Sequence, residues 1–235
     1  YLVRAMTGEG DIVMDFFAGS GSTAHGVMLQ NSEDGCNRRY ILVQLPEPLR
    51  PGDAQSKPAL EFCRAHGVSP TIAEIGKERI RRAAAAVASK QRAFRLDLGF
   101  RVFRFDSSNV RPWDADPGNL GKSLMRSAER IKDDRREADV TCELVLKYGL
   151  DLAASVEKRE IEGKAVYIVG EGDLVVCLAD RISLRLAEGI ARLPVEFPTT
   201  QMRAVLNDAG FESDADRVNT VRILHRAGVL HVVTL

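Results

Sequence analysis

The sequence lacks an excess of charge of either sign, because 33 basic residues balance 33 acidic residues. Net charge therefore indicates neither a nucleic-acid-binding protein nor a membrane-surface protein, and any basic surface must be local. Aromatic residues are scarce, and no apolar run approaches the roughly 18 residues that a membrane-spanning helix needs. With no recognisable signal peptide either, we expect a cytoplasmic protein without a membrane span.

Cysteine is also scarce, and its spacing excludes several kinds of chemistry. The four cysteines lie far apart in the sequence and in no metal-ligand spacing. No serine lies in the strand-to-helix elbow of a hydrolase, and no Cys/His pair suggests a nucleophile. We therefore predict neither a metal site nor covalent catalysis.

The chain is long enough for two modest domains, each with its own core. Residues 106–118 contain Pro112, Pro117 and Gly118 among several Ser and Asp residues, which is typical of a domain boundary. The sequence therefore predicts a first domain over residues 1–105, a linker over 106–118 and a second domain over 119–235. Because the chain starts with Tyr1 and soon enters a strand pattern, we expect it to be a fragment of a longer protein.

The first domain contains the pattern of a βαβ unit. Residues 12–17 form a nearly continuous apolar run, which predicts a strand buried on both faces of a parallel sheet. A glycine-rich turn over 18–22, a helix over 23–30 and a strand over 40–45 follow, and they predict a right-handed crossover. We also expect the end of a helix over 1–6, helices at 58–65 and 71–90, and a strand at 100–105.

The second domain is predicted to be a smaller α/β domain. Three short strands are expected at 155–161, 165–169 and 174–178, joined by hairpin turns at 162–164 and 170–172. Helices are expected at 120–134, 138–149, 180–193 and 214–227, and a last strand at 229–235.

The glycine turn after the first strand is the stretch that indicates chemistry. Gly19 and Gly21 permit a tight turn and a close approach of the backbone to a ligand. The helix that follows directs free amide groups at the turn, which suits a nucleotide-like ligand with a carboxylate or phosphate. A purely structural turn is the alternative.

Two ligand classes compete for this turn. Gly19, Gly21 and Ala24 satisfy the Gly-x-Gly-x-x-Ala fingerprint of dinucleotide-binding proteins. That fingerprint expects an acidic residue at the end of the next strand, where this chain has Gln44, and Glu47 lies beyond a proline. The missing acid argues against an NAD(P)-binding oxidoreductase.

The second class is indicated by a resemblance. The string Asp15-Phe-Phe-Ala-Gly-Ser-Gly-Ser-Thr23 resembles the first motif of amino-methyltransferases that act on DNA, Asp-x-Phe-x-Gly-x-Gly. Similar stretches occur at 37–47, 99–109 and 208–216, so that essentially the whole chain looks like the C-terminal portion of the modification (Mod) subunit of type III restriction–modification systems. Ser22 stands where that family usually has Thr.

The resemblance implies a partial Rossmann-like methyltransferase sheet followed by the smaller α/β domain. It implies methyl transfer from S-adenosylmethionine to the adenine amino group at a specific DNA site. It also implies association with DNA, with further copies of the subunit as a homo-oligomer, and with a restriction helicase–nuclease subunit. On this basis Asp15 orders the turn or approaches the methionine ammonium, and Phe17 forms an apolar wall. The residues expected to bind the cofactor are Asp15, Phe17, Ala18, Gly19, Ser20, Gly21, Thr23, Gln44 and Glu47.

The same family places its catalytic Asp-Pro-Pro-Tyr-type loop upstream of the glycine motif. This chain contains no such loop, since its one Asp-Pro pair, Asp116-Pro117, is followed by Gly118. We therefore predict no catalytic residue here and no activity of the fragment alone. A non-catalytic module in which residues 119–235 join subunits is the alternative function.

A basic stretch over residues 77–111 has ten Lys or Arg residues and only three acidic ones. It is either a solvated helix face or a stripe that faces phosphates, and both interpretations stay open at the level of sequence.

Overall fold

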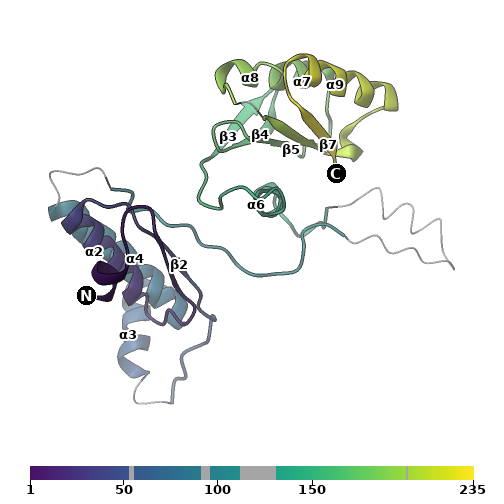
Figure 1. Ribbon diagram of the computed structural model, residues 1–235. Coiled ribbons are helices and arrows are strands. Elements are labelled where there is room, and N and C mark those ends of the chain that lie inside the picture. The colour runs from purple at the N-terminus through teal and green to yellow at the C-terminus, as the bar shows by residue number, and fades with distance from the viewer. Residues whose placement is uncertain (53–55, 91–95, 112–130, 200) are drawn as a thin grey trace. The chain divides into compact units, whose positions relative to one another are not determined.

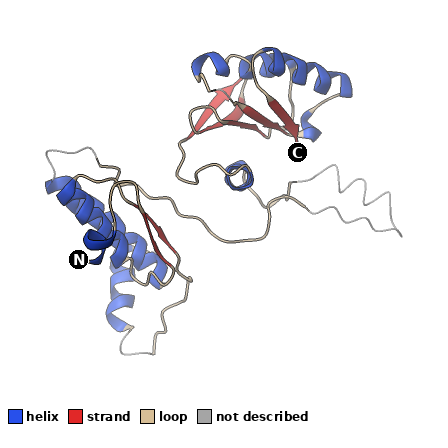
Figure 2. Cartoon of the chain, in the orientation of Figure 1, coloured by secondary structure: helices blue, strands red, loops and turns tan. Residues whose placement is uncertain are grey.

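A computed structural model describes residues 1–52, 56–90, 96–111, 131–199 and 201–235 (Figure 1). The chain divides into two compact units, which we call the N-terminal unit (Tyr1–Val102) and the C-terminal unit (Phe103–Leu235). Both contain helices and strands, so the fold is mixed α/β (Figure 2).

The N-terminal unit is built on the predicted βαβ arrangement. Strands β1 (Ile12–Asp15) and β2 (Arg39–Leu42) pair in parallel, and helix α2 (Ser22–Asp34) connects them. The parallel pairing expected from the sequence is confirmed. The remaining helices are α1 (Leu2–Met6), α3 (Lys57–His66) and α4 (Ile72–Lys90).

The core of this unit lies on one face of the two-stranded sheet. Ala24 and Met28 of α2 pack with Ile80, Ala83 and Val87 of α4, and Tyr40 and Leu42 of β2 pack against this cluster. The helical pattern of residues 71–90 accounts for α4, since its apolar residues recur every three or four positions. Thr71 Oγ1 accepts a hydrogen bond from the Glu74 amide at 3.2 Å, which caps α4 at its start.

The opposite face of the sheet corrects one sequence prediction. Strand β1 was expected to be buried on both faces, but Ile12 and Met14 are 49% and 59% exposed. Ile41, which pairs with Met14, is 49% exposed on the same face. Because α2 and α4 cover only one face, these apolar side chains are not covered by any residue that the structure describes. The Rossmann-like sheet therefore stays a prediction.

The strand expected at residues 100–105 is wrong. The chain there forms neither strand nor helix, and Val102, Phe103 and Phe105 are exposed. The alternating pattern fits a strand, but strand formation requires a neighbour for hydrogen bonding, and the described residues provide none at this place.

The C-terminal unit contains a five-stranded mixed sheet in the order β3-β4-β5-β6-β7. Strands β3 (Val156–Ile161), β4 (Lys164–Val169) and β5 (Leu174–Cys177) form the predicted antiparallel meander. Strands β6 (Arg203–Leu206) and β7 (His231–Thr234) continue the sheet in parallel with β5. Strand β6, which lies between β5 and β7, was not predicted from the sequence.

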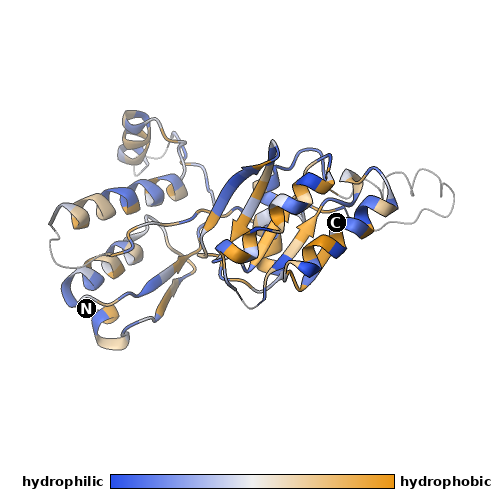
Figure 3. Cartoon of the chain, turned by 90° about the horizontal axis from the view of Figure 1, so that it is seen from above, coloured by the Kyte–Doolittle hydropathy of each residue, from blue (hydrophilic) through white to orange (hydrophobic). Residues whose placement is uncertain are grey.

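Helices cover both faces of this sheet. Leu186 and Ile190 of α7 (Leu184–Ile190) and Leu224 of α9 (Asp214–Arg226) pack on one face. Val140 and Leu144 of α6 (Glu137–Lys147) pack on the other. In Figure 3 the orange colour of the central strands shows how apolar this layer is.

Two helix predictions in this unit need correction. The helix expected at 180–193 is instead two short helices, α7 and α8 (Leu193–Glu196), and Pro194 lies in the first turn of α8. Proline has no amide proton to continue the hydrogen-bonding pattern of a preceding helix, so a new helix starts there. Of the helix expected at 120–134, residues 120–130 lie outside the described residues, and 131–134 form a bridge and a turn.

Residues 106–111, the first part of the predicted linker, are held by α6. Glu143 accepts hydrogen bonds from Ser108 Oγ and from the Asn109 amide, each at 2.6 Å. Val110 forms an antiparallel bridge with Ile131, and Arg135 pairs with Asp106 at 2.9 Å. This stretch is therefore part of the C-terminal unit, and residues 112–118 lie outside the described residues.

Candidate cofactor-binding site

The glycine turn connects the carboxyl end of β1 to the start of α2. Gly19 and Gly21 have φ values of 53° and 76°, in the left-handed region that favours glycine. The Gly21 amide donates to the Ala18 carbonyl oxygen at 2.8 Å, which closes the turn directly before the helix. Both glycines are thus required by the backbone conformation.

Asp15 holds this turn from the end of β1. Its Oδ1 accepts a hydrogen bond from the Phe17 amide at 3.1 Å, and its Oδ2 accepts one from Thr23 Oγ1 at 2.5 Å. The carboxylate therefore joins the first residues of the turn to the first turn of α2. Asp15 was expected either to order the turn or to approach the methionine ammonium, and this geometry fits the first role.

Gln44 holds the turn from the side of β2. Its Oε1 accepts a hydrogen bond from the Gly19 amide at 2.7 Å, and its Nε2 donates to the Leu45 carbonyl oxygen at 3.2 Å. The Ala18 amide also donates to the Val43 carbonyl oxygen at 3.1 Å. The side chain of Gln44 is therefore engaged in holding the backbone of the turn at Gly19.

The structure brings part of the predicted site together. Asp15, Gly19, Thr23 and Gln44 form one cluster with two hydrogen-bonded pairs, Asp15 with Thr23 and Gln44 with Gly19, and Ala18, Ser20 and Gly21 complete its backbone. Phe17 is 84% exposed, with its ring 5.2 Å from that of Phe16. Glu47 is exposed and lies outside this cluster in the described part of the chain.

The start of α2 provides the electrostatics of the site. Gly21 is the N-cap residue and offers no side chain to the amides of the first turn, and that turn contains no acidic residue. The free amides and the helix dipole therefore favour an anionic ligand group at this end. A carboxylate or a phosphate fits this requirement equally.

Gly76 of α4 also lies against the turn and was not predicted from the sequence. A Cβ atom placed on Gly76 would lie 3.3 Å from the Gly19 carbonyl oxygen. The signal was present in the sequence, because glycine inside a long amphipathic helix is unfavourable and needs a reason. Only the tertiary structure shows that the reason is this contact.

The basic stretch is partly neutralised where the structure describes its side chains. Lys77 pairs with Glu74 at 2.6 Å, and Glu78 pairs with Arg82 at 2.9 Å and with Arg81 at 3.4 Å. A hydrogen bond from Arg82 lowers the pKa of Glu78. These pairs favour the solvated-face interpretation for α4. The side chains of residues 90–95 lie outside the described part.

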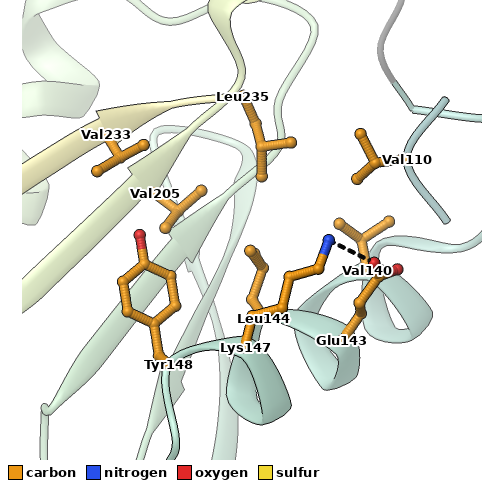
Figure 4. A pocket seen from close by; sticks show the side chains of 9 residues that line it. All are labelled: Val110, Val140, Glu143, Leu144, Lys147, Tyr148, Val205, Val233 and Leu235. Carbon is orange, nitrogen blue, oxygen red and sulfur yellow. Dashed lines mark ion pairs between the residues drawn. The ribbon is translucent and has the colours of Figure 1, made fainter. Parts of the chain in front are cut away.

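The C-terminal unit contains a separate apolar pocket of about 280 Å³ (Figure 4). Its residues come from α6, β6, β7 and the stretch before residue 112; they are Val110, Val140, Glu143, Leu144, Lys147, Tyr148, Val205, Val233 and Leu235. Its charged residues, Glu143 and Lys147, pair with each other at 2.6 Å. Burial raises the pKa of Glu143, but hydrogen bonds from Lys147, Ser108 and the Asn109 amide outweigh it and lower the pKa to about 2. An ion pair of this kind is not a poised acid or base.

Two further findings concern the described residues as a whole. Within them, no group of three or more His, Cys, Asp or Glu residues is arranged to hold a metal ion. Among the helices of the same residues, none combines the length and the apolarity that crossing a membrane requires.

Comparison with known proteins points to one class of enzyme. No family model matches the chain. The chain is 38% identical over 113 residues to the type III restriction–modification enzyme StyLTI Mod subunit of Salmonella typhimurium, covering 48% of this chain and 16% of that protein. It is 40% identical over 100 residues to the EcoP15I Mod subunit of Escherichia coli, covering 43% of this chain and 13% of that protein.

A third relative extends the class. The type II methyltransferase M.KpnI of Klebsiella pneumoniae is 40% identical over 48 residues, which are 20% of this chain and 12% of that protein. The relatives are thus restriction–modification enzymes, and one is named a methyltransferase. Within that class this chain is Mod-like, and the resemblance to type III Mod subunits indicated by its motifs is confirmed. It spans only about a sixth or less of the length of these relatives.

Proposed function

We propose that this chain is the cofactor-binding part of an S-adenosylmethionine-dependent DNA adenine methyltransferase of the type III restriction–modification class. The observation that carries the proposal is the glycine turn between parallel strand and helix, held by Asp15 and Gln44. The similarity to two Mod subunits supports it independently.

The residues of the turn fit S-adenosylmethionine by their chemistry. The first amides of α2 suit the carboxylate of its methionine part. The exposed ring of Phe17 suits an apolar contact with the cofactor, and Glu47 is the carboxylate available for ribose hydroxyls. When bound, the cofactor supplies an electrophilic methyl group on its sulfonium, while the residues of this chain bind and orient it.

Methyl transfer also needs a loop that holds the target base. Extruding adenine from the duplex costs a few kcal/mol, which a catalytic loop offsets by stacking and hydrogen bonding. This sequence contains no Asp-Pro-Pro motif followed by an aromatic residue. We propose that the chain alone binds cofactor without transferring its methyl group, and that DNA, further copies of the subunit and a restriction subunit are partners of the whole enzyme in the cytoplasm.

Calorimetry with two ligands tests the cofactor. We expect S-adenosylhomocysteine to bind the chain and NAD to give no heat, because the dinucleotide site lacks its acidic residue. Binding of NAD without binding of S-adenosylhomocysteine would overturn the proposal in favour of an oxidoreductase. Self-association of the chain with binding of neither ligand would favour the assembly module.

Gly21→Val provides a matched test of the turn. A Cβ atom on Gly21 would lie 3.3 Å from the Gly76 carbonyl oxygen, and its φ of 76° strains a branched residue. We expect cofactor affinity to fall at least about tenfold, since small misplacements at a site have large effects. Gly8→Val is the control, because nothing lies within 4 Å of a Cβ there. Equal affinities of the two variants, with native circular dichroism, would contradict a role for the turn.

Incubation with labelled S-adenosylmethionine and mixed-sequence duplex tests the absence of the catalytic loop. We expect no methyl transfer, and at most weak DNA binding that declines steeply with salt, because only backbone contacts are available. Site-specific methylation by this chain would show that the catalytic residues lie within it.

A further inference from the structure

Gly76 occupies an unusual place in helix α4. The helix runs from Ile72 to Lys90, and Gly76 is buried in its second turn. Glycine is less favourable than alanine inside a helix. A helical residue has no need of the left-handed conformation, so the backbone angles of Gly76 give no reason for glycine. The remaining reason is the space that a side chain would fill.

That space is occupied by the glycine turn. A Cβ atom on Gly76 would lie 3.3 Å from the Gly19 carbonyl oxygen and 3.5 Å from the Ser20 carbonyl carbon. Conversely, a Cβ atom on Gly21 would lie 3.3 Å from the carbonyl oxygen of Gly76 and 3.5 Å from the Cα of Gly76. The two segments thus touch through their backbones, and the three atoms nearest to a Cβ on Gly76 all belong to the backbone of the turn.

Helix α4 is the more firmly held of the two segments. Its residues Ile80, Ala83 and Val87 belong to the buried core of the N-terminal unit. Its start is tied to the chain after β2 by a bridge between Thr71 and Pro48 and by the Leu49 amide, which donates to the Pro70 carbonyl oxygen at 2.8 Å. In the turn, Gly19 and Ser20 are partly exposed, whereas Ala18 and Gly21 are buried. A methyl group on Gly76 would meet the backbone of Gly19 and Ser20, so we expect these two residues to shift by a few tenths of an ångström rather than the helix.

We infer that Gly76 is a positioning residue of the cofactor site: the absence of a side chain there sets the position of the Gly19–Gly21 backbone. The inference rests on the proposed function for its effect on cofactor affinity. Its effect on the geometry of the turn is independent of any ligand. The ligand class concerned is a nucleoside whose carboxylate or phosphate group meets the start of α2.

Gly76→Ala tests the inference against a matched control. Gly26 also lies inside a helix, α2, but nothing lies within 4 Å of a Cβ at that position. Gly26→Ala should raise the Tm by about 4 °C through helix propensity alone. It should leave the amide resonances of Gly19 and Gly21 in place, along with the Kd for S-adenosylhomocysteine.

For Gly76→Ala we expect a different pattern. The amide resonances of Gly19, Ser20 and Gly21 should move, and the Kd should rise about 3- to 10-fold, a fraction of the effect of a 1 Å misplacement. The Tm should stay near that of the wild type, because helix propensity and crowding oppose each other. A change in affinity without a loss of stability is not expected of a merely structural residue.

Two outcomes overturn the inference: unmoved turn resonances in Gly76→Ala, or a Kd that Gly76→Ala and Gly26→Ala change equally. Failure of the wild type to bind S-adenosylhomocysteine overturns the proposed function instead. The resonances of the turn still decide the role of Gly76 in that case, so the two failures are distinguishable.

Discussion

The two units of this chain bury their apolar residues in different ways. The five-stranded sheet of the C-terminal unit has helices on both faces, and the side chains of its central strands β4, β5 and β6 are almost all fully buried. Among the described residues, the two-stranded sheet of the N-terminal unit has helices on one face only, and its core cluster contains five buried residues. The unit with the smaller core nevertheless holds the candidate site.

This difference indicates which interactions stabilise each unit. The C-terminal unit is held by apolar packing, whereas the N-terminal unit relies on polar side chains at the ends of its strands. At one end Asp15 and Gln44 bind the glycine turn. At the other, the side chain of Arg38 is only 3% exposed and binds Thr7 of the α1 end, and Asn31 and Asp34 of α2. The following substitutions test this contrast.

The largest effect is expected in the C-terminal unit. Leu206→Ala removes a fully buried side chain from β6 and leaves a cavity in the core. We expect the free energy of unfolding of this unit to fall by about 4 kcal/mol, measured by urea denaturation. Val195→Ala, at a position 86% exposed, is the control and should change it by less than about 0.5 kcal/mol. A small effect of Leu206→Ala would show that packing does not dominate here.

In the N-terminal unit the comparable effect should come from a charge. Arg38→Met keeps most of the side-chain volume but removes donors to the Thr7 carbonyl oxygen at 2.9 Å and to Asp34 at 2.9 Å. We expect a loss of about 1 to 3 kcal/mol, because part-buried acceptors lose their donor. Arg4→Met on exposed α1 is the control. If both arginine variants were equally stable, the polar cluster would not be what holds this unit.

The ion pair on α6 predicts a dependence on pH. The folded pKa of Glu143, about 2, lies below its ordinary value of 4.5. Its stabilising contribution is therefore complete above pH 4.5 and is lost as the pH falls from 4.5 towards 2. We expect Glu143→Gln to lower stability by about 2 kcal/mol at pH 7 and to flatten the acid dependence of the C-terminal unit. Glu171→Gln, in an exposed turn, should leave the wild-type pH profile unchanged.

The smallest effect on stability is expected on the open face of the N-terminal sheet. Ile41→Thr replaces a side chain that is half exposed, so unfolding free energy should change by less than about 0.5 kcal/mol. Binding of a hydrophobic dye should nevertheless decrease, because the face loses apolar area. Leu42→Thr, on the core-facing side of the same strand, should destabilise by more than about 1 kcal/mol. The opposite order would mean that the two faces have been assigned wrongly.

Much of the fold could be predicted because its signals are local. The βαβ unit and the β3–β4–β5 meander each depend on turns and periodicity within a few residues. Strand β6 could not be predicted, because four residues carry little pattern and its order comes from β5 and β7 on either side. Residues 100–105 are the reverse case: their alternating pattern fits a strand, but no described strand lies beside them to pair with.

The residues of the candidate site likewise divide into those that could be predicted from the sequence and those that could not. Asp15, Gly19, Gly21 and Thr23 lie in one continuous stretch, so their proximity follows from the motif. Gln44 could be placed by reasoning that neighbouring parallel strands end at one edge of a sheet. Gly76 could not, because its contact depends on where α4 crosses the turn, which no local pattern specifies.

The order of strands in the C-terminal sheet has a consequence for how that unit folds. Strands β3 and β4 are joined by Glu162 and Gly163, both with positive φ, which is the tight type I′ turn of a hairpin. Such a hairpin closes in about 10 microseconds or less. Strands β6 and β7 pair in parallel and can join only after the segments containing α7, α8 and α9 have closed over the sheet, at a higher cost in loop entropy. The sheet should therefore grow from its antiparallel side, and the docking of β7 should limit the folding rate of the unit.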